Sequence, residues 1–118
     1  MGGPGNMREF SYRQPRMMTS FRVEFCVGDD CFHGFCRDIS ERGIRAEFVD
    51  SLIQGSSGLL ILRPRIGVLE VRSQVAYVED DHAGLLFVFQ TPMERKMTAE
   101  FIAGILKDSG PPPVLSLT

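Results

Sequence analysis

The sequence predicts an all-β fold, a six-stranded antiparallel barrel followed by one C-terminal amphipathic helix. Three observations lead to this prediction. Short runs of residues alternate between apolar and polar side chains, which is typical of half-buried strands. Turns rich in glycine and aspartate separate these runs at short intervals. The last run before a proline-rich tail has helical periodicity instead. Because closure removes the unpaired edges of short strands, we expect the strands to form a small barrel.

Six runs are expected to form the strands of this barrel. The run 20–27 alternates most clearly, with four apolar side chains on one face. Gly28 and the two aspartates after it supply the turn chemistry of a hairpin. The other expected strands are 31–37, 44–48, 58–62, 68–79 and 83–89. The last is apolar almost throughout, which favours a more fully buried position.

The predicted helix begins at a recognisable capping sequence. Thr91 is placed to cap it, Pro92 occupies the first helical position, and Glu94 can close a capping box. Apolar residues then recur at four-residue steps with two more beside them, which makes one stripe. The members of this stripe are Met93, Met97, Phe101, Ile105, Ile102 and Leu106. We expect the stripe to plug one end of the barrel; contact with a partner is the alternative.

The chain divides into three expected parts. Residues 1–9 are glycine-rich and lack periodicity, so they are expected to be flexible, and 108–118 form a proline-rich tail. The domain itself is expected at 10–107, and it opens with an arm. Pro15 disfavours a helix in this arm, so Arg13 and Arg16 are expected on an irregular or extended segment.

Composition excludes several classes of protein. A net charge of −2 does not favour indiscriminate DNA or RNA binding, and no apolar run is long enough to span a membrane. The N-terminus lacks the pattern of a signal peptide, and the cysteine count is odd, so a reducing, cytoplasmic compartment is expected. Cys26, Cys31 and Cys36 have His33 among them but no C-x-x-C pair. They are therefore interpreted as structural cysteines, with no metal bound.

A dense polar segment at 38–43 is the strongest candidate for a functional site. Asp38, Ser40 and Gly43 lie within six residues, between two alternating runs. A carboxylate can accept paired N–H donors of a ligand, and a hydroxyl can donate or accept. A glycine permits a positive φ or the close approach of a flat group. The alternative is a plain Asx or ST turn with no ligand.

This arrangement resembles the PilZ domain family. The resemblance rests on the arginine-bearing arm, a hairpin of about 20 residues, the Asp38-x-Ser40-x-x-Gly43 turn, the barrel and the C-terminal helix. It covers roughly residues 10–107. The family's first motif is Arg-x-x-x-Arg; here Arg16 matches the second arginine, Tyr12 occupies the place of the first, and Arg13 comes one residue late.

The resemblance implies a receptor for cyclic di-GMP, a bacterial second messenger, which passes the signal to a protein partner. In the family, arm arginines hold phosphates and guanine rings, and the Asp and Ser of the turn hold a guanine edge. Carried onto this sequence, the implied ligand-binding residues are Arg13, Arg16, Asp38, Ser40 and Gly43, with Tyr12, Arg42 and Arg45 as further candidates. Arg45 has a second interpretation, a cross-strand ion pair with Glu47 or Glu24.

No set of residues with catalytic spacing is found, so we expect a binding module without a cofactor and not an enzyme. A second hypothesis starts from Tyr12. A degenerate PilZ module without cyclic di-GMP binding would act only through protein contacts, and its surfaces would be the helix stripe and the tail at 111–113.

Overall fold

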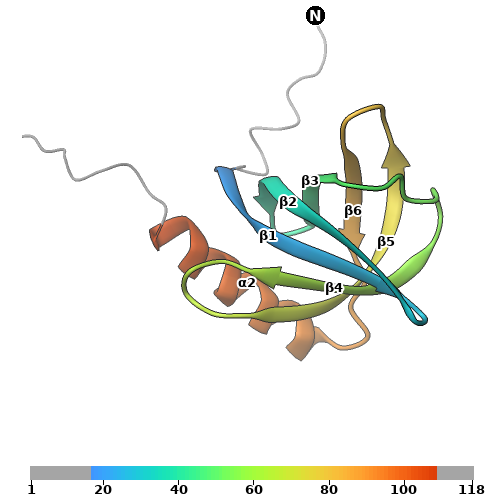
Figure 1. The fold of residues 1–118 in the computed structure, drawn as a ribbon. Coiled ribbons are helices and arrows are strands. Elements are labelled where there is room, and N and C mark those ends of the chain that lie inside the picture. The colour runs from blue at the N-terminus through green and yellow to red at the C-terminus, as the bar shows by residue number, and fades with distance from the viewer. Residues whose placement is uncertain (1–16, 109–118) are drawn as a thin grey trace, which may run out of the picture.

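A computed structural model describes residues 17–108. Six antiparallel strands close into a barrel in the order β1-β2-β3-β6-β5-β4 (Figure 1). The predicted fold class is therefore confirmed. The strands are β1 Met17–Val27, β2 Asp30–Ser40, β3 Gly43–Phe48, β4 Ser57–Arg63, β5 Leu69–Val78 and β6 Ala83–Phe87. The helix α2, Pro92–Asp108, follows them.

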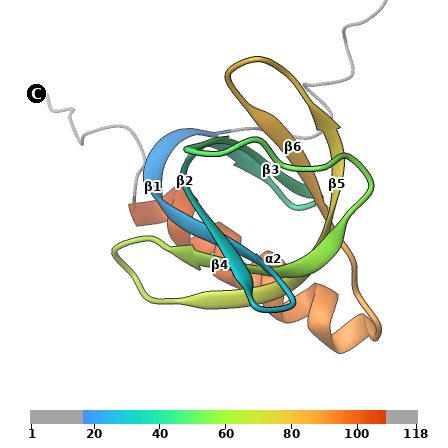
Figure 2. The ribbon, with the colours of Figure 1, turned by 45° about the vertical axis from the view of Figure 1, so that its right-hand side comes forward.

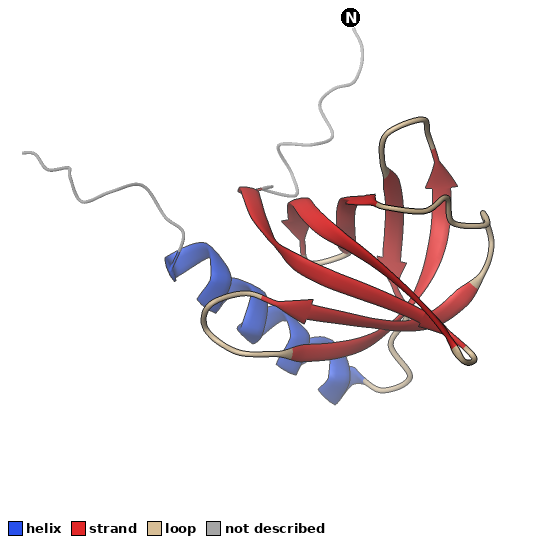
Figure 3. Ribbon diagram, in the orientation of Figure 1, coloured by secondary structure: helices blue, strands red, loops and turns tan. Residues whose placement is uncertain are grey.

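One continuous core fills the barrel. Every strand contributes buried side chains to it, and Phe25, Leu60 and Leu85 are among those fully removed from water. Ile102 and Ile105 of α2 belong to the same cluster of buried side chains. In Figure 3 the helix runs along one end of the barrel, and in Figure 2 the β5–β6 turn projects at the other end. The helix thus closes one end of the barrel, as the sequence predicts.

The start of α2 has the predicted Thr91 cap, and Glu94 reaches back to the amide one residue before the expected one. The Glu94 amide donates to the Thr91 hydroxyl at 3.1 Å, and the Glu94 carboxylate accepts from the Gln90 amide at 2.9 Å. Both contacts satisfy backbone donors at the start of a helix, where no intrahelical acceptor exists. Proline at the first helical position lacks a donor that would need a partner.

The predicted apolar stripe of α2 is only partly right. Ile102 and Ile105 are buried, and Phe101 and Leu106 pack against the core, but the side chains of Met93 and Met97 are 62% and 59% exposed. Four residues rotate a helix by more than one full turn of 3.6, so a row at four-residue steps drifts around the axis. The N-terminal half of this row therefore faces away from the barrel.

The candidate segment 38–43 is less of a turn than predicted. Asp38 and Ser40 lie in β2, and Gly43 begins β3 as the register partner of Ser40. Only the two residues Glu41 and Arg42 form the connection. An irregularity in the register between Cys36 and Asp38 shifts the side chains of β2 at this point. Such bulges re-aim side chains, and sequence alternation alone does not reveal them.

Candidate functional site

The Asp38 carboxylate on β2 meets the Arg45 guanidinium on β3. The two residues are register partners, and Arg45 Nε donates to Asp38 Oδ2 at 2.7 Å, with Nη2 directed at the same oxygen. The Asp38 side chain is 1% exposed, whereas that of Arg45 is 40% exposed. The hydrogen bond to Asp38 raises the pKa of Arg45 above its ordinary value. Arg45 thus presents one side to the buried carboxylate and the other to solvent.

The pairing with Asp38 contradicts the predicted ion pairs of Arg45, and the part of Arg45 in ligand binding stays a prediction. The predicted alternatives, Glu47 and Glu24, have other partners: Glu47 pairs with Arg37 at 3.2 Å, and Glu24 with Arg63 at 3.2 Å. Arg45 instead belongs with Asp38 at the candidate site. A buried carboxylate needs such a charged donor because its desolvation is otherwise strongly unfavourable.

Ser40 and Arg42 hold the β2–β3 connection. The Ser40 hydroxyl accepts a hydrogen bond from the Arg42 amide at 3.2 Å, which is an ST-turn contact. The Arg42 carbonyl in turn accepts from the Phe87 amide at 2.8 Å, so the connection is tied to β6. Ser40 is buried and the Arg42 side chain is exposed. The turn interpretation of Ser40 therefore describes its contacts in this structure.

Gly43 is required by the packing of two strands. A Cβ at this position would lie 2.0 Å from the Leu85 carbonyl oxygen. Within the described residues, the glycines with positive φ are Gly28, Gly55 and Gly67, so of the two alternatives for Gly43 a positive φ does not apply. The close approach that Gly43 permits is that of the β6 backbone.

Two residues that the sequence analysis missed extend the site across the sheet. Arg45 lies opposite Gly84 of β6, and Gly84 lies opposite Tyr77 of β5. The Tyr77 ring covers Gly84 so closely that a Cβ there would lie 2.1 Å from a ring carbon. The Tyr77 hydroxyl also contributes to the raised pKa of Arg45. Asp38, Arg45, Gly84 and Tyr77 thus form one row across β2, β3, β6 and β5.

A bulge explains why Tyr77 was missed. Simple alternation along β5 places it on the same face as the buried Val71 and Val75. The register shifts between Val75 and Tyr77, so that Tyr77 pairs with Gly84 on the face that carries Arg45. His82 then packs its ring edge-on against Tyr77, with centroids 5.7 Å apart. Gly84 itself was the available signal, because a glycine inside a strand often marks the close approach of another group.

The arm residues Tyr12, Arg13 and Arg16 lie outside the described residues, so the structure does not place them. The start of β1 does show where the chain enters the barrel. Met17 pairs with Ile39, and Met18 pairs with Asp38. Arg16 therefore precedes Met18, the register partner of Asp38, by two residues in the sequence.

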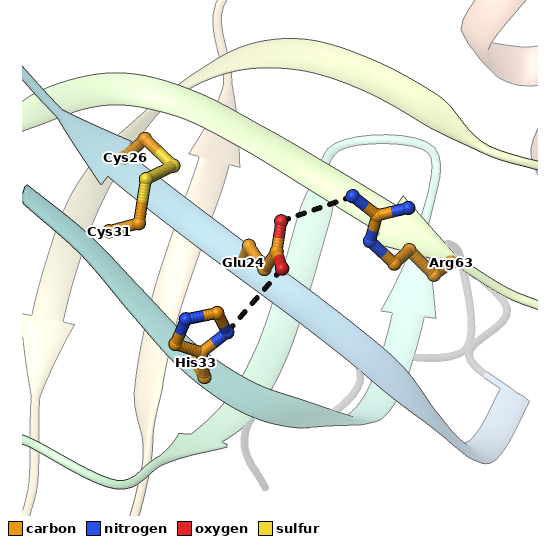
Figure 4. The surroundings of a disulfide bond; sticks show 5 residues. All are labelled: Glu24, Cys26, Cys31, His33 and Arg63. Atoms are coloured by element: carbon orange, nitrogen blue, oxygen red, sulfur yellow. Dashed lines mark hydrogen bonds and ion pairs between the residues drawn. A yellow bond between two sulfur atoms is a disulfide. The ribbon is translucent and has the colours of Figure 1, made fainter.

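The cysteines depart from the sequence prediction. Cys26 and Cys31, opposite each other on β1 and β2, are joined by a disulfide (Figure 4). Cys36 is free and buried. The sequence analysis expected three thiols in a reducing compartment, whereas disulfides are typical of oxidising ones. His33 pairs with Glu24 at 3.4 Å. No group of three or more His, Cys, Asp or Glu side chains within 17–108 could hold a metal ion.

Comparison with known proteins identifies the family. The family model for the PilZ domain matches residues 11–105, and the chain belongs to the PilZ domain family. A search of curated protein sequences found no match. Among the helices of the described part of the chain, none is long and apolar enough to cross a membrane.

Solved structures with the same fold are distant in sequence. The PilZ domain of YcgR from Escherichia coli, solved with c-di-GMP, is 12% identical with a TM-score of 0.69, covering 82% of this chain and 92% of that one. The PilZ domain of CeSA from a cellulose-synthesizing bacterium is 12% identical with a TM-score of 0.64, covering 75% and 95%. The inhibitor of motility MotI/DgrA from Bacillus subtilis is 16% identical with a TM-score of 0.63, covering 88% and 53%.

Proposed function

We propose that this protein is a cytoplasmic cyclic di-GMP receptor that passes the signal to a protein partner. In the reducing cytoplasm the Cys26–Cys31 disulfide would be open, and the pairing of β1 with β2 and β4 would hold the hairpin in place. Family membership supports the general kind of function, a binding module and not an enzyme. The observation that carries the proposal is the register of β1 on β2. Because Met18 is paired with Asp38, the arginine-bearing arm joins the barrel beside the carboxylate of the Asp38-x-Ser40-x-x-Gly43 motif.

The row Asp38–Arg45–Gly84–Tyr77 suits a guanine nucleotide. Guanine presents two N–H donors on one edge, which a carboxylate accepts, and O6 and N7 on another, which an arginine fork recognises. Asp38 and Arg45 offer these two functions side by side. Tyr77 adds an aromatic ring at the end of the row, next to the guanidinium. Arg13 and Arg16 would supply positive charge for the two phosphates, as the family motif implies.

Arg45 has to release or share Asp38 when the ligand binds. Its Nε and Nη2 both point to Asp38 Oδ2, and the carboxylate is almost wholly covered. Since the guanidinium is partly exposed, it can swing toward a phosphate or a guanine face while the guanine edge takes its place. Binding would then exchange one charge-assisted pair for another.

Isothermal titration calorimetry with cyclic di-GMP tests the proposal. We expect saturable heat for the natural chain and a loss of about tenfold or more in affinity for Arg16→Ala, because a charge-assisted fork is removed. Arg95→Ala is the matched control, since Arg95 is exposed on α2 and its side chain makes no contact with the row. Absence of heat from folded protein at tens of micromolar ligand contradicts the proposal.

A degenerate module that acts only by protein contact is the second candidate, and Tyr12 in the place of an arginine motivates it. The variant Tyr12→Arg separates the two. If the natural chain does not bind cyclic di-GMP and Tyr12→Arg does, the degenerate module is favoured. A change of only a few fold in an existing affinity favours the receptor, in which Arg13 compensates for the missing arginine.

A further inference from the structure

A groove on the outer face of the barrel lies apart from the row described above. It has a volume of about 240 Å³ and runs over β1, β2 and the end of β4. The side chains at its rim are Arg22, Glu24, His33, Phe35, Val49 and Arg63. We call it the Arg22 groove. Asp38, Ser40 and Arg45 are not among its lining residues, so it is a separate surface.

The carboxylate in this groove, that of Glu24, already has two partners. Figure 4 shows Glu24 between Arg63 and His33, with Oε1 on Arg63 Nη2 at 3.2 Å and Oε2 on His33 Nδ1 at 3.4 Å. Arg22 is different. Its exposed guanidinium has no hydrogen bond or ion pair with any residue in the described range 17–108. Within the described residues, the groove therefore offers one arginine whose donors are not committed to another protein group.

Apolar side chains flank this arginine. Phe35 is the register partner of Arg22, so the two side chains are neighbours on the same face. Phe35 is 50% exposed and Val49, across the groove, is 82% exposed. An exposed aromatic ring beside an uncommitted arginine is the composition found at the energetic centre of protein interfaces.

We propose that the Arg22 groove is a docking site for a protein partner that presents an acidic side chain next to an apolar one. The carboxylate would fork onto Arg22, and the apolar side chain would cover Phe35 and Val49. A single uncommitted guanidinium matches one carboxylate. It matches a ligand with two phosphates poorly, because Arg63, the other arginine of the groove, is already paired with Glu24. This docking site would be the partner surface of the proposed adaptor. It rests on the part of the proposed function in which the protein passes the signal to a protein partner.

The experiment is a titration of the ¹⁵N-labelled full chain, without cyclic di-GMP, by N-acetyl-Leu-Glu-amide, monitored by NMR. We expect shift changes at the amides of Phe35 and Val49 and at Arg22 Nε. The dissociation constant should be on the order of 1–10 mM, as for a fragment of a larger epitope. The matched probe N-acetyl-Leu-Gln-amide should bind about tenfold more weakly, because the charge-assisted pair is lost.

Two variants sharpen the test. Arg22→Gln should weaken the acidic probe about tenfold and abolish the preference for Glu over Gln, while Arg95→Gln on α2 should leave both unchanged. Unchanged shifts in the rest of the barrel show that each variant is folded. Equal binding of the two probes, no shifts at the groove, or shifts there caused by cyclic di-GMP would overturn the proposal. Because cyclic di-GMP is absent from the main titration, a failure of the docking site can be distinguished from a failure of cyclic di-GMP binding in the calorimetry.

Discussion

At the scale of single residues, Gly43 shows how a motif residue can serve the fold. A Cβ at Gly43 would lie 2.0 Å from the Leu85 carbonyl oxygen, so β3 and β6 would have to separate. We expect Gly43→Ala to lower the free energy of unfolding by about 3 kcal/mol, the upper part of the usual range for overpacking. Urea denaturation measures this change.

Gly28→Ala is the control for that substitution. Gly28 has a φ of 61°, and a Cβ there would meet no atom within 4 Å. Only the left-handed backbone disfavours alanine at Gly28, which costs about 1 kcal/mol. If the two variants lost the same free energy of unfolding, the close approach of β3 and β6 would not be the reason for glycine at position 43.

Cys36 gives the molecule a pH-dependent contribution to stability. Its thiol is buried, and burial, followed by the Asp38 charge, raises its pKa to about 12 from an ordinary 9.0. The folded state therefore keeps a proton that the unfolded state loses above pH 9. The contribution is complete below that pH and falls by about 1.4 kcal/mol per pH unit as the pH rises toward the folded pKa. Urea denaturation across this range should show a steeper loss for the natural chain than for Cys36→Ala, and parallel curves would contradict the assignment.

The candidate residues of the site could be named from the sequence, but their contacts could not be predicted. Asp38, Ser40 and Gly43 stand out because a carboxylate, a hydroxyl and a glycine lie close together between two strands. That Arg45 forks onto Asp38 depends on the register of β3 after the irregularity at Cys36. Tyr77 reaches the same row only because β5 has its own register shift. Both shifts are set by packing across strands, which a single run of residues does not encode.

At the scale of elements, the disulfide gives the β1–β2 hairpin a covalent link that can be broken without opening the barrel. Cys26 and Cys31 are five residues apart, so the link closes a small loop worth roughly 2 kcal/mol in chain entropy. Strand pairing on both sides of β1 remains after reduction. We expect mild reduction to lower the melting temperature while the barrel stays folded.

Thiol counting in the native protein measures this directly. Oxidised protein should show no reactive thiol, since the free cysteine in the structure, Cys36, is buried. Reduced protein should show two, and denaturation should raise the count to the three cysteines of the sequence. The Cys26→Ser, Cys31→Ser double variant is the control, and in its native state it should show no reactive thiol with or without reductant. Two reactive thiols before reduction would mean that the disulfide is absent.

Element boundaries were predicted more reliably than the faces that elements present. All six strands and the helix occur where alternation and the capping sequence placed them, with ends that differ by a few residues. The helix stripe was wrong at Met93 and Met97 because a row at four-residue steps does not stay on one face. The disulfide was missed because pairing of Cys26 with Cys31 follows from the hairpin register, whereas their number and spacing suggested free thiols.

At the scale of the whole molecule, the helix and the barrel share one core. Ile102 and Ile105 lie in the same buried cluster as residues from all six strands. The β4–β5 connection also rests on the helix: a Cβ at Gly104 would lie 3.0 Å from Ile66, and Arg65 pairs with Asp108 at 3.3 Å. A helix held only at the surface would unfold by itself. These contacts instead couple its unfolding to that of the strands.

We therefore expect the domain to unfold in a single transition, and a pair of helix variants tests this. Ile102 is 1% exposed and Met97 is 59% exposed, so Ile102→Ala should cost about 2–5 kcal/mol and Met97→Ala well under 1. In urea, circular dichroism at 222 nm follows the helix, and tyrosine fluorescence includes Tyr77 on β5. Both signals should move to lower urea together in Ile102→Ala, because the side chain supports the barrel as much as the helix. If the helix signal were lost first while the fluorescence transition stayed in place, α2 would be a separate unit and not the closure of the barrel.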